Sequence, residues 1–283
     1  MPRILLAYPA DEVPVRYGAA LDGLRRLGEV IVNSHDGAMT PDEIAAAAQG
    51  CDVIVADRNT PFDAALIARL PKIKALVRAS IASSSPGSSD IPAASAAGIL
   101  VTRAGPGFRD AVVELLLGQM IDLARGLSDN VIAYRAGRMP ERRPGIQLAG
   151  RTASIIGYGN LGRRMAEVLG VLGMRVLVHD PHVAEIAPPA RAASRDEALA
   201  QGDFVICLAL HHAETDQSMN REAFRRMKRG AFFMNPSRGR VVDEAALAEA
   251  LREGTIAGAA LDVGSDPDDI GQRAKRDRRH VVG

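Results

Sequence analysis

The chain has 283 residues, of which 47% are hydrophobic, and a formal net charge of +1. This length exceeds what one hydrophobic core comfortably serves, so we expect two domains. A net charge so close to zero creates no field that attracts nucleic acid or an anionic membrane surface. Because no apolar run reaches the roughly 18 to 20 residues of a membrane span, we also expect no membrane partner.

Two cysteines, Cys51 and Cys207, lie far apart in the sequence in apolar surroundings. No CxxC pair or His and Cys cluster accompanies them, which argues against a disulfide or a metal site. We predict buried free thiols in a reducing compartment, and therefore a cytoplasmic protein. The amino-terminal run MPRILLAYPA predicts a first strand rather than a secretory signal.

Short apolar runs alternate with helical patterns in the first part of the chain. We predict helices at 17–27 and 41–49, the second capped by Thr40 and starting with Pro41. The predicted strands of this part lie at 4–8, 29–32, 53–56, 74–78 and 99–101. Such alternation of strands and helices predicts a parallel sheet.

A long amphipathic helix at 109–125 is expected to connect this part to a second alternating series. The Arg- and Pro-rich stretch 135–147 is predicted to be a loop. The predicted strands of the second series lie at 152–156, 174–179, 203–210, 231–235 and 257–261. Strands separated by helices in this way predict a doubly wound parallel sheet of the α/β class.

The motif Gly157-Tyr-Gly159-Asn-Leu-Gly162 directly follows one predicted strand and opens a helix. The first glycine allows a tight turn, the second lets the backbone approach a pyrophosphate, and the third permits close packing of helix and strand. The amino terminus of the helix favours the anion. We predict a dinucleotide site here; the alternative is a structural turn that merely requires glycine.

Asp180 ends the next predicted strand and precedes Pro181. A carboxylate at this place accepts hydrogen bonds from the adenosine ribose and repels a 2′-phosphate, which favours NAD over NADP. The alternatives are an Asp that serves only a turn, and a phosphate partner supplied by Arg191 or Arg195.

From Gly150 to Val263 the chain resembles the NAD-dependent D-isomer-specific 2-hydroxyacid dehydrogenases. The motifs that carry the resemblance are GYGNLG, the His179-Asp180-Pro181 segment, MKRGAFFMNPSRGRVVDEAALAEAL and the AGAALDV run. A weaker likeness covers 90–108 and 111–114. The resemblance implies two Rossmann-like domains: a flavodoxin-like substrate domain at 1–102 and an NAD-binding domain at 103–270, followed by an atypical basic tail at 271–283.

The resemblance also implies the chemistry, a hydride transfer between nicotinamide C4 and C2 of a small 2-keto or D-2-hydroxy acid. Arg238 would orient the substrate carboxylate and polarise its carbonyl, and Asp262 would accept from the nicotinamide carboxamide. A homodimer is implied, with the helix at 109–125 contributing. The remaining cofactor contacts expected on matching positions are Gly157, Gly159, Asn160, Leu161, Gly162, Asp180, Pro181, His211, Pro236 and Ser237. The expected substrate contacts are Arg78, Ala79, Ser80 and Arg238.

The chain departs from the family where the proton donor should be. Family members place a Glu before a Pro downstream of the acid matched by Asp262, and here Asp266 before Pro267 is our one-residue-shifted candidate. The family's acid His, in a Pro-His-x-Gly-Gly segment, has no counterpart, and we regard His280 in the tail as fortuitous. His211 and His212 follow a predicted strand at the cofactor edge; the alternative to a site role there is a loop role.

The substrate loop departs as well, because RASIASSSPGSSD at 78–90 lacks the glycines of the family's corresponding run. For the tail 271–283 we expect an interruption of the reading frame near 266–272; the alternative is a natural basic tail. Two functions therefore stay open. One is an NAD-dependent 2-hydroxyacid dehydrogenase, and the other is an inactive NAD(H)-binding sensor or interaction module on the same scaffold.

Overall fold

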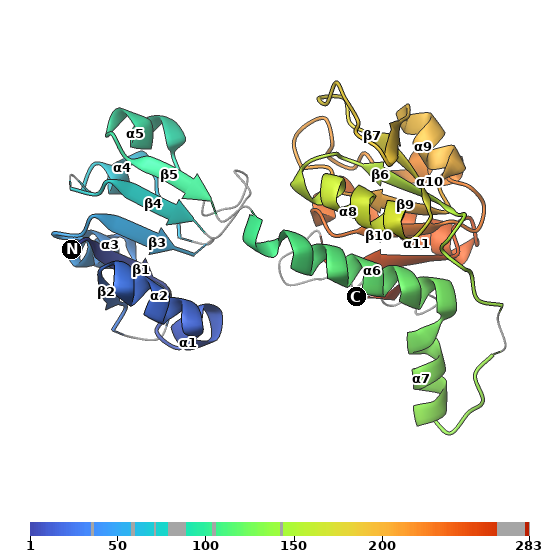
Figure 1. The fold of residues 1–283 in the computed structure, drawn as a ribbon, viewed down its shortest axis with the longest axis horizontal. Coiled ribbons are helices and arrows are strands. Elements are labelled where there is room, and N and C mark those ends of the chain that lie inside the picture. Colours follow the sequence, from blue (N-terminus) through green and yellow to red (C-terminus); the bar gives the residue numbers. More distant parts are fainter. Residues whose placement is uncertain are drawn as a thin grey trace. The chain divides into compact units, whose positions relative to one another are not determined.

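A computed structural model describes residues 1–34, 37–57, 60–70, 72–78, 89–103, 106–141, 144–264 and 281–282 (Figure 1). The chain divides into two compact units, Met1–Gly107 and Phe108–Gly283. The boundary that the sequence predicted lay between residues 102 and 103. Each unit has a parallel sheet and a core of its own.

The first unit is built on a five-stranded sheet in the order β2-β1-β3-β4-β5. All neighbouring strands are parallel, with Leu5 opposite Ile54 and Ile54 opposite Leu76. This is the strand order of flavodoxin-like sheets. The strands are β1 (Arg3–Ala7), β2 (Glu29–Val32), β3 (Val53–Ala56), β4 (Ala75–Arg78) and β5 (Leu100–Arg103).

Alternate side chains of β1 enter cores on the two faces of this sheet, as the two-residue period of a strand requires. Leu5 packs with Phe62 and Leu66, whereas Leu6 packs with Val13. Thr40 caps α3 reciprocally with Glu43, which confirms the cap that the sequence predicted. The helices are α1 (Glu12–Tyr17), α2 (Ala19–Leu27), α3 (Pro41–Ala47), α4 (Ala64–Ile67) and α5 (Ile91–Ala96).

The second unit is built on a seven-stranded parallel sheet in the order β12-β11-β10-β9-β6-β7-β8. Counted from β6, this is the 3-2-1-4-5-6 order of dinucleotide-binding sheets, extended by one short strand. The doubly wound sheet that the sequence predicted is therefore confirmed. The strands are β6 (Thr152–Ile156), β7 (Arg175–His179), β8 (Ala190–Ala192), β9 (Phe204–Cys207), β10 (Phe232–Asn235), β11 (Gly258–Leu261) and β12 (Val281–Val282).

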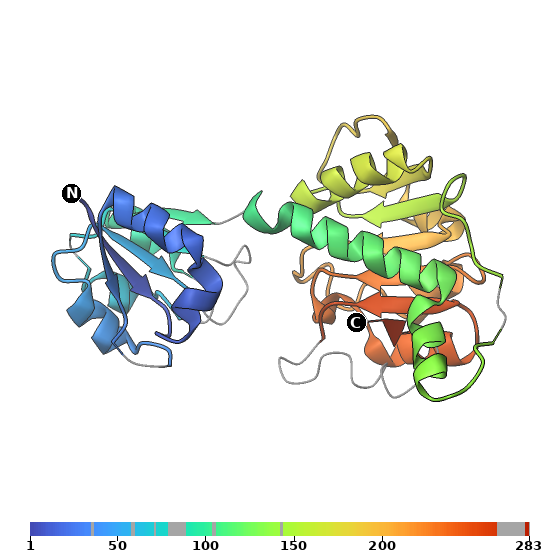
Figure 2. The same cartoon turned by 60° about the horizontal axis from the view of Figure 1, so that its bottom comes forward.

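Helices cover both faces of this sheet. α6 (Arg109–Arg125) and α8 (Asn160–Val171) lie together on one face, where α6 crosses the strands (Figure 2). α9 (Arg195–Gln201), α10 (Arg221–Arg226) and α11 (Glu244–Arg252) pack on the opposite core. Phe232 and Phe233 of β10 point into the two different cores, so this strand is buried on both sides.

Several details differ from the sequence-based expectations. The predicted helix at 17–27 is wrong in its start, because Gly18, at φ 43°, separates α1 from α2. α7 (Leu127–Arg135), which follows the left-handed Gly126 and turns away from the sheet (Figure 1), was not predicted. β8 and β12 were not predicted either, because each has only two or three residues. Among the helices described, none combines the length and apolarity needed to cross a membrane.

Asp203 ties the start of β6 to the turn before β10. Its Oδ2 accepts from the backbone N–H of Thr152 at 2.8 Å, and its Oδ1 pairs with the Lys228 ammonium at 2.6 Å. Partial burial opposes ionisation of this carboxyl, but the bonds from Lys228 and Thr152 outweigh it and hold the pKa of Asp203 below its ordinary value.

We predict that Asp203→Asn lowers the free energy of unfolding of the second unit by about 1–2 kcal/mol at neutral pH. A depressed folded-state pKa stabilises the fold above the unfolded pKa of about 3.9 and stops doing so as the pH falls through the folded pKa. Urea denaturation from neutral to acidic pH should therefore show the two stability curves converging in acid. Glu222→Gln, which removes a 72%-exposed carboxylate paired with Arg226, should leave stability nearly unchanged; an equal loss in both variants would contradict the prediction.

Candidate functional site

The candidate site lies at the carboxyl ends of the strands in the second unit. β11, β10, β9, β6 and β7 are neighbours in this order and all run parallel, so the segments that follow them meet at one edge of the sheet. The direction of winding reverses between β9 and β6, which is where ligands bind in open α/β sheets. The predicted residues that this edge brings together follow β6 (157–162), β7 (180–181), β9 (211), β10 (236–238) and β11 (262).

The glycine turn after β6 depends on glycine at two of its three positions. Gly157 has φ 103°, and a Cβ there would lie 2.8 Å from the backbone of Leu208 and Ala209, which directly follow β9. A Cβ on Gly162 would lie 2.3 Å from the carbonyl oxygen of Gly157. The turn therefore has its shape because the backbone of α8 and the loop after β9 approach it closely.

Gly159 is different, because an added Cβ would meet no heavy atom within 4 Å. It caps α8 with no side-chain hydrogen bond, so no capping side chain occupies the first turn formed by Asn160, Leu161 and Gly162. An open approach to the first N–H groups of a helix suits a pyrophosphate. The geometry of the turn therefore fits a dinucleotide.

Asp180 holds the end of β7 against the glycine turn. Its Oδ2 accepts from the backbone N–H of Tyr158 at 2.7 Å, and its Oδ1 accepts from that of His182 at 2.9 Å. Each carboxylate oxygen can accept more than one hydrogen bond, so both keep a capacity for ribose hydroxyls. Pro181, which lies between Asp180 and His182 in the chain, is exposed.

The segment after β10 is folded around the side chain of Asn235. This residue is 1% exposed; its Oδ1 accepts from the Ser237 hydroxyl at 2.7 Å and from the Ser237 N–H at 3.1 Å. Its Nδ2 donates to the carbonyl oxygen of Arg238 at 3.0 Å. Pro236 and Ser237 are thereby buried, while the half-buried Arg238 has its backbone position set by Asn235.

Asn235 is a positioning residue that the sequence analysis did not assign. The signal that would have found it is an Asn as the last residue of a strand and before Pro-Ser, because Asn side chains bond the backbone two residues on. Arg238 also donates from its guanidinium to the carbonyl oxygen of Ser237 at 2.6 Å. The loop thus holds both the backbone carbonyl and the guanidinium of Arg238.

Asp262 follows β11, next to the end of β10. Its backbone N–H donates to the carbonyl oxygen of Asn235 at 3.2 Å, which joins the two strand ends. Its side chain is exposed, yet the surrounding protein partly desolvates it and raises the pKa of Asp262 above its ordinary value. A carboxylate with weak local solvation is a good acceptor for an amide N–H2 group.

His211 belongs to a polar cluster inside the loop after β9. Its Nε2 lies 2.7 Å from Oδ1 of Asp216, and that oxygen also lies 3.3 Å from Nε of Arg240. The hydrogen bond to His211 is the largest of the causes that lower the pKa of Asp216. Asp216, which the sequence analysis did not name, therefore links the loop of His211 to the segment after Arg238.

Arg78 ends β4 in the first unit and is 4% exposed. Its guanidinium donates to the carbonyl oxygen of Thr60 at 2.8 Å and lies 5.1 Å from the centre of the Phe62 ring. Burial lowers the pKa of Arg78, and the nearby Asp57 opposes this effect. Ala79, Ser80 and Asp266, predicted as substrate or catalytic residues, lie outside the described residues, as do Pro267 and His280.

Comparison with known proteins identifies the family. Residues 117–277 match the family model described as "D-isomer specific 2-hydroxyacid dehydrogenase, NAD binding domain". The chain is 30% identical over 268 residues to the D-3-phosphoglycerate dehydrogenase of Methanocaldococcus jannaschii, covering 93% of this chain and 49% of that protein. It thus spans about half the length of that relative.

In two further comparisons the match covers a larger share of the related protein. The chain is 31% identical over 236 residues to the glycerate dehydrogenase of Methylorubrum extorquens, covering 81% of this chain and 72% of that protein. The crystal structure of the TT0316 protein from Thermus thermophilus superposes with a TM-score of 0.81 at 30% identity, covering 99% of this chain and 88% of that one. The chain therefore belongs to the D-isomer specific 2-hydroxyacid dehydrogenase family and carries its NAD-binding domain.

Proposed function

We propose that the chain is an NAD-dependent oxidoreductase that moves a hydride between nicotinamide C4 and C2 of a small D-2-hydroxy or 2-keto acid. The observation that carries the proposal is the single sheet edge at which the glycine turn, Asp180, Arg238 and Asp262 all lie. NAD, when bound, supplies or accepts the hydride. The protein's own groups bind and orient both reactants.

Arg238 is the group that we assign to the substrate. A guanidinium donates two parallel hydrogen bonds to a carboxylate and stays charged at any working pH. The backbone bond from Asn235 to Arg238 supports this role, because it limits how far the side chain can shift while substrate is held. An oriented cation beside the carbonyl oxygen also stabilises the negative charge that develops there during reduction.

The cofactor contacts follow the order of the strands. We assign the pyrophosphate to the first turn of α8 and the adenosine ribose to Asp180. Pro236 and Ser237 are assigned to the nicotinamide ribose, and Asp262 to the carboxamide. His211 borders this path on the loop after β9. The first unit, Met1–Gly107, is the proposed substrate domain, and we assign Arg78 at the end of its strand β4 to the substrate contacts.

The direct test measures the loss of NADH absorbance with hydroxypyruvate, glyoxylate and pyruvate, beside a fluorescence titration of NADH binding. Turnover of at least one of these acids supports the proposal. Binding of NADH without turnover of any of them would overturn the oxidoreductase assignment, and the absence of both would overturn the cofactor assignment as well.

The alternative function is an NAD(H)-binding sensor or interaction module without turnover. The observation that favours it is that Nε2 of His211, a histidine at the proposed cofactor edge, is hydrogen-bonded to Asp216 in its own loop. The same two measurements decide between the functions, because such a module binds NADH but does not oxidise it with any of the three acids.

We further propose a homodimer formed through α6 and α7, in a cytoplasmic protein. Two cysteines that are both free and buried suit a reducing compartment. α7 presents large apolar side chains to solvent, including Ile132 at 60% and Tyr134 at 62% exposure, and α6 adds Leu115 at 44%. Several large apolar side chains exposed on neighbouring helices favour an interface, and we propose that a second copy of the chain buries them.

We expect Ile132→Asp to convert the dimer into a monomer, because it places a charge in the proposed apolar interface. Light scattering coupled to size-exclusion chromatography measures the change in mass. Val171→Asp is the matched control, since Val171 is 88% exposed at the end of α8 and lies outside the proposed interface. A wild-type chain that elutes as a monomer would sink the dimer assignment.

A further inference from the structure

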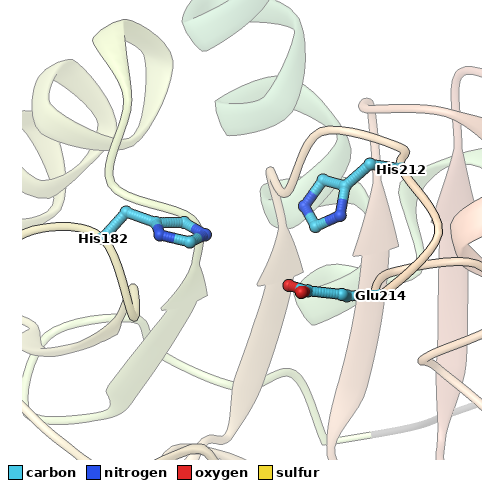
Figure 3. Close-up of side chains that lie close together, drawn as sticks. All are labelled: His182, His212 and Glu214. Carbon is cyan, nitrogen blue, oxygen red and sulfur yellow. The ribbon is translucent and has the colours of Figure 1, made fainter.

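His182, His212 and Glu214 form a cluster at the carboxyl edge of the second sheet. Each offers one ligand atom, and these atoms all lie within 4.8 Å of one another. The three side chains are exposed and point toward a common space from two different loops (Figure 3). His182 follows β7, while His212 and Glu214 follow β9.

Both loops are held by hydrogen bonds within the protein. The carboxylate of Asp180 accepts from the N–H of His182 at 2.9 Å. The Thr215 hydroxyl accepts from the N–H of His212 at 2.9 Å and donates to the carbonyl oxygen of Leu210 at 2.6 Å. These bonds fix the backbone of His182 and His212, so the binding of an ion requires only the side chains to reorient.

The donor set selects a class of ion. Two imidazoles and one carboxylate suit Zn²⁺ and neighbouring transition metals, whereas Mg²⁺ and Ca²⁺ prefer oxygen ligands alone. Bonds of about 2.0–2.1 Å in a tetrahedral site put ligand atoms roughly 3.3 Å apart. Rotations of exposed side chains close the remaining distance, and water supplies the fourth ligand.

The cluster lies beside the proposed path of the dinucleotide. β6 lies between β7 and β9 in the sheet, so the ligands come from the strands on both sides of the one that ends in the glycine turn. An ion bound to all three side chains joins the two loops across the end of β6. The dinucleotide path proposed above runs between the same two loops, past Asp180 and His211.

We infer that His182, His212 and Glu214 form a divalent transition-metal site whose occupation excludes NAD(H). This inference rests on the proposed cofactor path for the exclusion, but not for the metal site itself. Zinc and dinucleotide compete because the ion and the three side chains turned toward it fill the space between the two loops, where the adenosine half is proposed to lie. The site makes the affinity for NADH depend on the concentration of free zinc.

The first experiment titrates the untagged full chain with Zn²⁺ by isothermal calorimetry in the absence of nucleotide. We expect one Zn²⁺ per chain, with the affinity reduced roughly a hundredfold in His182→Gln, His212→Gln and Glu214→Gln, which each remove a ligand. The control is Glu185→Gln, an exposed carboxylate of the same loop as His182 that lies outside the cluster, and it should bind as the wild type does. The absence of binding, or equal binding in all variants, overturns the site.

The second experiment titrates NADH at increasing Zn²⁺. Competition predicts that the apparent Kd for NADH rises about tenfold when free zinc is ten times its own Kd, and that His212→Gln abolishes this rise. Zinc and NADH that bind together without mutual effect overturn the exclusion. A chain that binds zinc at the cluster but never binds NADH refutes the cofactor assignment and the exclusion, whereas the first experiment still decides the metal site.

Discussion

Arg238→Lys is expected to lower kcat/KM for the 2-keto acid by on the order of a hundredfold or more while the Kd for NADH stays within about twofold. Lysine keeps the positive charge but has no planar fork, so it cannot hold a carboxylate through two parallel hydrogen bonds. Arg238 is half-buried and its backbone is held by Asn235, so the lysine side chain cannot move to make the same two hydrogen bonds.

Steady-state NADH oxidation and an NADH titration of the same preparation check this expectation. Arg229→Lys is the matched control, because Arg229 is exposed in the turn before β10, at the opposite end of that strand. Unchanged turnover in Arg238→Lys would remove this residue from substrate binding. A parallel loss of NADH affinity would instead place it at the cofactor.

Gly159→Ala is expected to leave the fold intact and to weaken NADH binding by about tenfold or more, which is about 1.4 kcal/mol. An added Cβ meets no protein atom within 4 Å, and φ at this position is −74°, so alanine fits the folded chain. The methyl group occupies the space through which a pyrophosphate would approach the start of α8.

Gly157→Ala provides the contrast, because its Cβ would lie 2.8 Å from backbone atoms and its φ is 103°. We expect this variant to lose about 2–3 kcal/mol of stability, as strained backbone and a close contact combine. Thermal unfolding separates the two glycines, and Gly118→Ala on α6, which meets nothing within 4 Å, controls for the substitution itself. NADH binding by Gly159→Ala with wild-type affinity would show that no anion approaches this turn.

Several features were readable from the sequence because they depend on local chemistry. Apolar runs of the right length predicted β2, β3 and β6 with their observed bounds, and Thr40 followed by Pro41 predicted a capped helix. The amphipathic pattern at 109–125 matches α6 in full. The spacing of Gly157, Gly159 and Gly162 indicated a dinucleotide turn; close backbone contacts require glycine at the first and third positions, whereas the second leaves the start of α8 open.

Other features were missed because their cause is not local. α7 has only a weak apolar periodicity, so the hydrophobic pattern of its sequence does not distinguish it from a loop. β8 is so short that only its pairing with β7 makes it a strand. The bond from His211 to Asp216 joins two residues whose contact depends on how the loop after β9 turns.

The sequence by itself determined the two alternating series of strands and helices, the glycine turn and the residue types available for NAD and a carboxylate. These follow from periodicity, from the unique conformations of glycine and from side-chain chemistry. Only the tertiary structure decided which of these residues lie together at the carboxyl edge of the second sheet. Parallel pairing in the order β11-β10-β9-β6-β7 brings Arg238, Asp262 and Asp180 to one end of the sheet, although they are far apart in the chain. The same pairing sets His182 opposite His212 and Glu214, because contacts between loops depend on strand order rather than on sequence spacing.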